Sequence, residues 1–218
     1  MENQTKIILI RHGQSIGNAT KTILGHTDLD LTSQGYLQAK TTAEFLINEK
    51  IDVIYSSDLK RAMNTAIPHA KLHNLEVIPN KKLREMYVGA WENMKIDDII
   101  EKWGREMYEI DWFGNFGTFR FPEGESIKEG GERFYSEVKA ICEANVGKTI
   151  LISAHAAVIR AFWAIISNIA WENVASQLPF ASNASFSVAY YENGKILPEK
   201  YSSDEHLSEV GITKVKLI

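Results

Sequence analysis

Short apolar runs alternate with longer amphipathic segments along the chain, and this alternation predicts the secondary structure. Residues 6–10 (KIILI) and 149–153 (TILIS) are largely continuous apolar runs, which are typical of central strands covered on both faces. Further strands are predicted at 52–56, 75–79 and 185–191. The turn ENGK at 192–195 predicts a hairpin whose second strand covers 195–197.

Apolar residues at helical spacing fill the intervals between these strands. Thr32 is predicted to cap a helix that continues to about Leu46, and Asp58 is predicted to cap the next helix. Other helices are expected near residues 95–108, 129–143 and 156–167. Strands separated by helices favour a layered α/β fold with a mostly parallel central sheet, in one domain covering residues 1–218.

A segment rich in aromatic residues interrupts the alternation and predicts an insertion at about residues 93–127. Between Trp103 and Pro122, tryptophan, tyrosine and phenylalanine recur, with Gly114 and Gly117 between them. One interpretation is an aromatic lid over a substrate pocket, and the other is a satellite core or a dimer contact. Both interpretations remain open at this stage.

Charge and cysteine content narrow the class of protein. A net charge of −4 over 218 residues argues against a general nucleic-acid binder but not against an anionic small substrate. The single cysteine, Cys142, excludes an intramolecular disulfide and is expected to be a buried structural thiol. The polar start MENQTK lacks a signal-peptide layout, and the apolar window 154–171 contains His155 and Arg160, which indicates an interior helix. We expect a cytoplasmic protein with no membrane partner.

Polar residues of complementary chemistry follow the carboxyl ends of the predicted strands, where ligands bind in α/β sheets. The turn GQSIGN after the first strand offers backbone amides and the Asn18 side chain to an anion. A helix begins after the strand at 149–153, where the Ala156 amide and the helix dipole favour an anion. The charged and imidazole side chains of this set are Arg11, His12, Arg61, Glu85 and His155.

Together these residues predict a phosphoryl-transfer site. Arginines bind phosphate oxygens bidentately and stay charged. Cations beside a histidine disfavour its imidazolium form, so His12 can serve as a neutral nucleophile. A carboxylate near a phosphate is pushed toward keeping a proton, which Glu85 could donate to the leaving alkoxide. Each residue alone has an ordinary structural explanation, and the prediction depends on their joint occurrence.

The motif LIRHGQSIGN resembles the RHG signature of the histidine phosphatase superfamily, also called the phosphoglycerate mutase-like family. The similarity extends through DLDLTSQGYLQA, IYSSDLKRAMNTA, LREMYVGAWENM, PEGES, ISAHAAVIRAF, NASFSVAYYENG and DEHL, in matching order. The resemblance implies a three-layer αβα sandwich and no metal or organic cofactor. It also implies that His12 is the phosphorylated nucleophile and Glu85 the proton donor. The implied phosphate pocket comprises Arg11, Arg61, His155 and Asn18, with Gly25 approaching the substrate through its backbone.

The chain departs from the family pattern after the second histidine, where Ala156 and Ala157 replace two glycines. An alanine still supplies the backbone donor, but the methyl groups could narrow the pocket. A second feature, His69 and His73 at i and i+4, is compatible with a metal-binding helix. No third ligand is evident, so an exposed helix face is expected there.

Three functions fit these residues. A phosphatase acting on a small phosphorylated substrate is favoured, because the interval between Glu85 and His155 is compact. Its arginines (Arg105, Arg120 and Arg133) are scattered, whereas family mutases carry a longer insertion with additional basic residues. A phosphoglycerate mutase and a non-catalytic phospho-ligand binding protein are the alternatives. The aromatic insertion is a candidate homodimer contact.

Overall fold

Successive side chains of the first strand point to opposite faces of the sheet, and each face packs against a hydrophobic core of its own. In the computed structural model, which describes residues 4–213, β1 (Thr5–Arg11) lies in the middle of the central sheet. Ile7 and Leu9 belong to one hydrophobic core, whereas Ile8 and Ile10 belong to the other. Because both faces of the strand are covered, its apolar run is continuous. The predicted central position of this strand is confirmed.

The sheet has six strands in the order β4-β3-β6-β1-β7-β8. The first four strands in this order pair in parallel, and β7 and β8 form an antiparallel hairpin at one edge. This is the mostly parallel α/β sheet predicted from the sequence. The strands besides β1 are β3 (Val53–Ser56), β4 (Val77–Pro79), β6 (Thr149–Ala154), β7 (Phe186–Glu192) and β8 (Lys195–Ser203).

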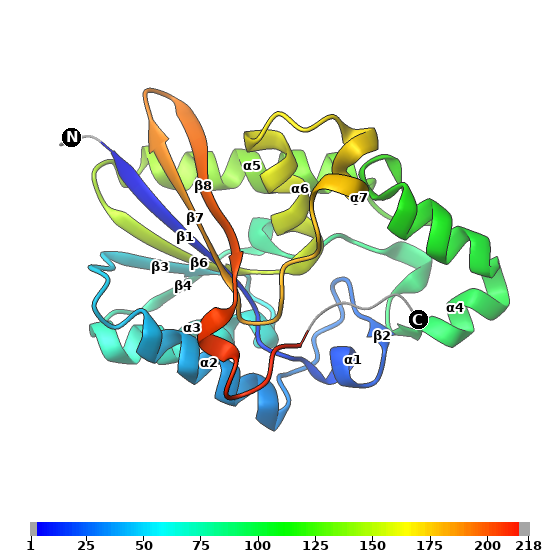
Figure 1. Ribbon diagram of the computed structural model, residues 1–218, viewed down its shortest axis with the longest axis horizontal. Coiled ribbons are helices and arrows are strands. Elements are labelled where there is room, and N and C mark those ends of the chain that lie inside the picture. The colour runs from blue at the N-terminus through cyan, green and yellow to red at the C-terminus, as the bar shows by residue number, and fades with distance from the viewer. Residues whose placement is uncertain (1–3, 214–218) are drawn as a thin grey trace.

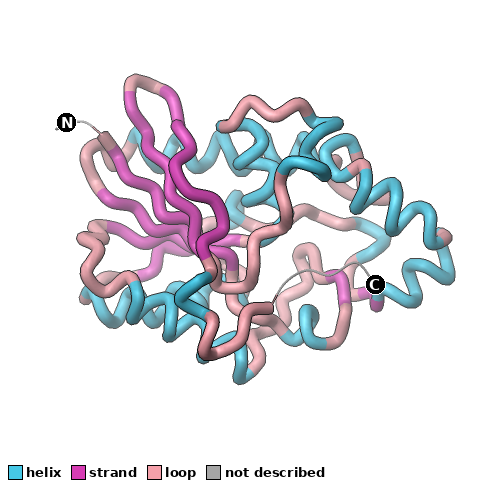
Figure 2. Tube along the Cα trace, in the orientation of Figure 1, coloured by secondary structure: helices cyan, strands magenta, loops and turns pink. Residues whose placement is uncertain are grey.

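Helices cover both faces of the sheet (Figures 1 and 2). One face carries α2 (Ser33–Phe45) and α3 (Lys60–His73), and the other carries α5 (Ile127–Glu143) and α6 (Ala156–Ile166). Between residues 4 and 213, no helix combines the length and the apolar character that crossing a membrane requires. The smaller elements are α1 (Ile16–Ala19), α4 (Ile96–Trp103), α7 (Val174–Gln177), β2 (Thr22–Ile23) and β5 (Met94–Lys95).

The two predicted helix caps have different outcomes. Thr32 caps α2, because its hydroxyl accepts a hydrogen bond from the Gly35 amide. The prediction for Asp58 is wrong, since α3 begins after Leu59 without a side-chain cap. Both Asp58 oxygens instead accept hydrogen bonds from Arg84, at 2.6 Å each. Asp58 is therefore paired with Arg84 and does not cap the helix.

The aromatic segment forms a compact core beyond the carboxyl edge of the sheet. The helix predicted to reach residue 108 ends at Trp103, because Gly104 adopts a positive φ of 92°. A π-helical segment, Met107–Gly114, follows it. The buried Trp91 ring lies at the centre of this core and contacts the rings of Trp103, Tyr108, Trp112, Phe119 and Phe121.

We expect Phe134→Ala to lower the free energy of unfolding by about 3–5 kcal/mol, because it leaves a cavity in the core. Phe134 is fully buried on α5, with its ring centre 5.7 Å from that of Phe162 on α6. Urea denaturation followed by circular dichroism measures the change. Leu72→Ala, on an exposed position of α3, is the matched control and should change stability by less than about 1 kcal/mol. Equal losses in both variants would contradict this assignment of the core.

Candidate active site

The strand β1 carries the first two site residues to the carboxyl edge of the sheet. Its pairing with β6 continues to Arg11, and the His12 amide donates to the Ala154 carbonyl at 3.0 Å. Gly13 then turns the chain against the start of α2, where an added Cβ would lie 2.4 Å from the Gly35 carbonyl oxygen. Two rigid attachments, one on each side, therefore fix the backbone of His12.

The imidazole of His12 is held in one tautomer. Its Nδ1 lies 2.7 Å from the Gly13 carbonyl oxygen, and a carbonyl only accepts. Nδ1 therefore carries the proton, and Nε2 carries the free lone pair. Burial lowers the pKa of His12 well below its ordinary value, and the charges of Arg61 and Arg11 lower it further. The neutral imidazole predicted from the sequence is thus favoured, with burial as the larger cause.

Arg11 and Arg61 are both almost fully buried and both bind backbone carbonyls. Arg11 Nη1 donates to the carbonyl of Ala181 at 2.5 Å. Arg61 donates from Nη1 to Thr27 at 2.8 Å and from Nη2 to Gly25 at 2.7 Å. Burial lowers the pKa of each guanidinium to about 10, and the charge of Glu85 opposes this shift in both. Both arginines therefore remain cationic at neutral pH.

The carboxylate of Glu85 occupies the N-terminus of α6. Its Oε2 accepts from the Ala157 amide, and its Oε1 accepts from the amides of Val158 and Met86, each at 3.0 Å. An anion was predicted at this helix terminus, and Glu85 supplies one there, held in one orientation by three donors. Ala156 lines the cavity, and the predicted contact of its amide with a substrate stays a prediction.

The ring of His155 lies next to that of His12. The two ring centres are 5.2 Å apart, at an interplanar angle of 63°. Neither ring nitrogen of His155 has a hydrogen-bond partner within residues 4–213, and the side chain is fully buried. Burial lowers the pKa of His155 well below its ordinary value, and Arg61 and His12 add to the effect. This ring is therefore neutral beside the proposed nucleophile.

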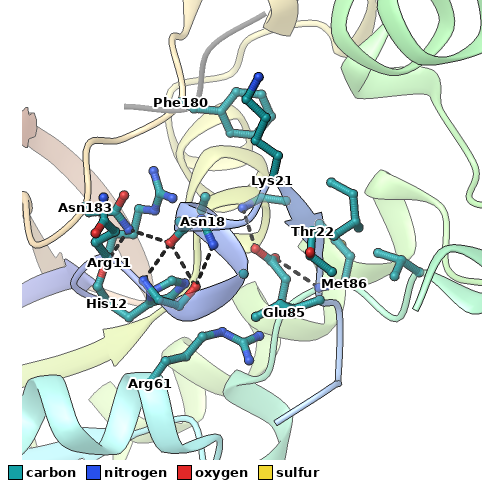
Figure 3. Close-up of a pocket in the computed structure, with 18 of the residues that line it drawn as sticks. Arg11, His12, Asn18, Lys21, Thr22, Arg61, Glu85, Met86, Phe180 and Asn183 are labelled. Atoms are coloured by element: carbon teal, nitrogen blue, oxygen red, sulfur yellow. Dashed lines mark hydrogen bonds between the residues drawn. The ribbon is translucent and has the colours of Figure 1, made fainter. Parts of the chain in front are cut away.

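Asn183, which the sequence analysis did not single out, connects two parts of the site (Figure 3). Its Nδ2 donates to the His12 carbonyl at 3.0 Å and to Asn18 Oδ1 at 3.1 Å. Asn18 Oδ1 also accepts from the Ser15 amide at 3.0 Å. Since these donors fix the oxygen, the amide group of Asn18 keeps its N–H donors for a ligand.

Glu92 organises the loop that holds Arg61 and is another residue absent from the sequence predictions. Its Oε1 accepts from the His26 amide, and its Oε2 accepts from the amide and hydroxyl of Thr27, each at 2.8 Å. Gly25 adopts a positive φ of 51°, and an added Cβ would lie 2.1 Å from Glu92 Oε1. Gly25 binds Arg61 through its carbonyl and is not among the cavity-lining residues, so its predicted contact with substrate stays a prediction.

A cavity of about 460 Å³ connects these residues. Arg11, His12 and Arg61 line one part of it, together with Asn18, Glu85 and Ala156 (Figure 3). Another part is lined by Tyr108, Trp112 and Phe121 of the aromatic segment. The lid and core interpretations of this segment are therefore compatible, because the same buried rings form the wall of the cavity.

The sequence predicts an exposed helix face for His69 and His73 on α3. This prediction is wrong for His69. His69 is fully buried, and burial lowers its pKa to about 3. Within the described residues, no group of three or more histidine, cysteine, aspartate or glutamate side chains could hold a metal ion. Cys142 is buried as predicted, and burial raises its pKa to about 12.

A family model described as the histidine phosphatase superfamily (branch 1) matches residues 7–204. The chain therefore belongs to this superfamily, as the sequence motifs implied. The metal-independent phosphoserine phosphatase of Arabidopsis thaliana is 33% identical over 210 residues, which cover 95% of this chain and 85% of that protein. The 2,3-bisphosphoglycerate-dependent phosphoglycerate mutase of Corynebacterium efficiens is 31% identical over 199 residues, with 78% and 79% covered.

The fold is shared with a solved mycobacterial glucosyl-3-phosphoglycerate phosphatase, which was crystallised with VO3. Its TM-score to this chain is 0.81 at 24% identity, with 91% of this chain and 98% of that chain covered. At this level of identity the likeness concerns the fold alone.

We expect Glu92→Gln to weaken binding of inorganic phosphate about 10- to 100-fold, because the amide nitrogen that replaces one carboxylate oxygen cannot accept from the donors facing it. The loop at 25–27 then no longer fixes the two carbonyls that position Arg61. Isothermal titration calorimetry measures the affinity. Glu44→Gln, on the exposed surface of α2, is the control and should bind phosphate as the parent protein does. Unchanged affinity in Glu92→Gln would exclude this positioning role.

Acid should destabilise the protein through its buried histidines. Burial lowers the folded-state pKa of His12, His155 and His69, whereas in the unfolded chain each returns to about 6.5. Below that pH the unfolded state binds protons that the folded state does not, so stability falls as the pH falls. The stability that these groups contribute is complete above about pH 7.5 and is lost progressively as the pH falls toward about 3, the folded-state pKa of His69.

Urea titrations across this range test the expectation. His69→Leu removes one of these protonations without touching the cavity. The free energy of unfolding of the variant should therefore fall less steeply with decreasing pH than that of the parent protein, and the two slopes should differ by up to about 1.4 kcal/mol per pH unit. Parallel pH profiles for the two proteins would show that His69 does not contribute.

Proposed function

We propose that this member of the histidine phosphatase superfamily is a phosphomonoester hydrolase that acts through a phosphohistidine on His12. The observation that carries the proposal is the fixed, neutral imidazole of His12 between two buried arginines. A nucleophile in this setting has its lone pair free, and the cations beside it attract the phosphate that it attacks.

In the first step, His12 Nε2 attacks phosphorus and the bond to the ester oxygen breaks. Glu85 takes up a proton when the phosphate dianion binds beside it, and it gives this proton to the departing oxygen, which leaves as an alcohol. Arg11, Arg61 and the Asn18 amide bind the oxygens of the transferring group and stabilise the charge that develops on them. His155, whose ring centre lies 5.2 Å from that of His12, is not among the cavity-lining residues, so its predicted contact with the phosphate stays a prediction.

In the second step, water attacks the phosphohistidine. Glu85 now accepts a proton from the water, so the proton it gave up is restored and inorganic phosphate is released. The backbone amides that bind Glu85 hold its carboxylate at the same place for both steps. No metal takes part in this scheme.

Hydrolysis is favoured over mutase chemistry by the charges of the cavity wall. A mutase must hold a second phosphate while it transfers the first. Among the described residues that line the cavity, Lys21 is the one cation besides Arg11 and Arg61. The similarity to a phosphoglycerate mutase keeps phosphoryl transfer to a second hydroxyl as the alternative. A cytoplasmic location and a homodimer stay predictions from the sequence.

We expect His12→Ala to lose hydrolysis by at least about 1,000-fold and to retain weak phosphate binding through the arginines. Phosphate release from 4-nitrophenyl phosphate measures turnover, and quenching in alkali followed by phosphohistidine detection tests the intermediate. A parallel incubation with 3-phosphoglycerate separates the alternatives. Isomerisation faster than release of inorganic phosphate would establish the mutase, and unchanged turnover in His12→Ala would overturn the mechanism.

A further inference from the structure

Beyond its phosphate-binding end, the cavity is a chamber with apolar walls. The chamber is lined by side chains of the β2 region, the loop after Glu85, the aromatic segment and the C-terminal part of the described chain. Its apolar lining includes Val88, Ile96, Trp112, Phe121, Phe180 and Ile212. Thr22, Tyr108 and Thr213 add hydroxyl groups to the lining, but most of the lining side chains are apolar. A substrate whose phosphate meets His12 therefore places much of the rest of its structure against hydrocarbon.

The aromatic wall is preformed. The ring centre of Trp112 lies 5.8 Å from that of Trp91, 5.9 Å from that of Phe121 and 6.3 Å from that of Phe180. The guanidinium of Arg160 lies over the Phe180 ring, 4.2 Å from its centre, and helps to fix it. Because these rings are packed on one another, the chamber keeps its shape without a ligand, and an apolar group gains the full benefit of burial.

The charged residues that line the chamber further restrict which leaving groups it can accept. Among the described cavity-lining residues, Glu85 is the only carboxylate, and three backbone amides already bind its oxygens. An ammonium group on the substrate would therefore have to share this one carboxylate with the backbone amides and with the leaving oxygen that Glu85 protonates. In the view of Figure 3, Lys21 extends away from His12 and Arg61. Because Lys21 lines the cavity, its charge makes the cavity unfavourable for a second positive charge.

We propose that the preferred substrate is a phosphomonoester of a bulky, ring-containing apolar alcohol without a cationic group. The inference rests on the proposed phosphatase activity and specifies its substrate class. It separates this chain from its relative named a phosphoserine phosphatase, since the alcohol in phosphoserine is small and zwitterionic.

Three phosphate esters of primary alcohols test the preference: 2-phenylethyl phosphate, O-phosphoserine and glycerol 1-phosphate. The alcohols released from the last two are the better leaving groups, so intrinsic reactivity works against the proposal. We expect kcat/KM for 2-phenylethyl phosphate to exceed the other two by about 10- to 100-fold, mainly through KM, because a phenyl ring is buried. An equal or higher kcat/KM for O-phosphoserine or glycerol 1-phosphate would overturn the proposal and leave the phosphatase activity intact.

Loss of the proposed function would have a different outcome. No phosphate would then be released from any of the three esters or from 4-nitrophenyl phosphate. The two hypotheses therefore fail in distinguishable ways.

Two half-exposed wall positions allow a test in variants that keep the core. Ile96 is the first residue of α4, where an aspartate suits the helix terminus, and Ile212 is 38% exposed. We expect Ile96→Asp and Ile212→Asp each to reduce the preference for 2-phenylethyl phosphate at least about 10-fold. Ile47→Asp, at an exposed site away from the cavity, should retain the preference.

Thermal melting and inhibition by inorganic phosphate show whether each variant is folded and keeps its phosphate-binding end. A preference that persists in both folded cavity variants would overturn the assignment of the chamber as the leaving-group site.

Discussion

The burial of two like charges, Arg11 and Arg61, is the constraint on which the rest of the site depends. Removing a guanidinium from water costs several kcal/mol unless other groups replace its hydration. Here backbone carbonyls and the charge of Glu85 provide that replacement. The segments that carry those carbonyls must therefore be rigid. This requirement explains why Glu92 binds the loop at 25–27 and why Gly25 adopts a conformation that other residues disfavour.

The same two charges determine what the cavity binds and how His12 behaves. Without a ligand the pair is incompletely satisfied, since Arg11 Nε has no hydrogen-bond partner in the described chain. A phosphate dianion supplies acceptors and the opposite charge, so binding relieves a penalty that folding imposed. The cations and burial also keep His12 neutral. One arrangement thus binds the electrophile and leaves the nucleophile unprotonated.

Sequence reasoning succeeded where local pattern determines structure. The continuous apolar run of β1 identified a central strand, and Thr32 identified the start of α2. It failed where contacts between residues far apart in the sequence determine the role of a side chain. Asp58 pairs with Arg84 instead of capping α3, and Asn183 reaches His12 across most of the chain. No local signal distinguishes such residues from ordinary surface polar residues, because their partners are chosen by the fold.

The aromatic segment shows why the choice between lid and core was not decidable from composition. Trp112 packs on Trp91 within the core and at the same time lines the cavity. A substitution there would alter stability and substrate fit together. Wall positions that are partly exposed, such as Ile96 and Ile212, show less of this coupling, although Ile96 still packs against the core. Substrate preference in this fold can therefore change at the rim of the chamber while the aromatic core and the buried arginine pair stay as they are.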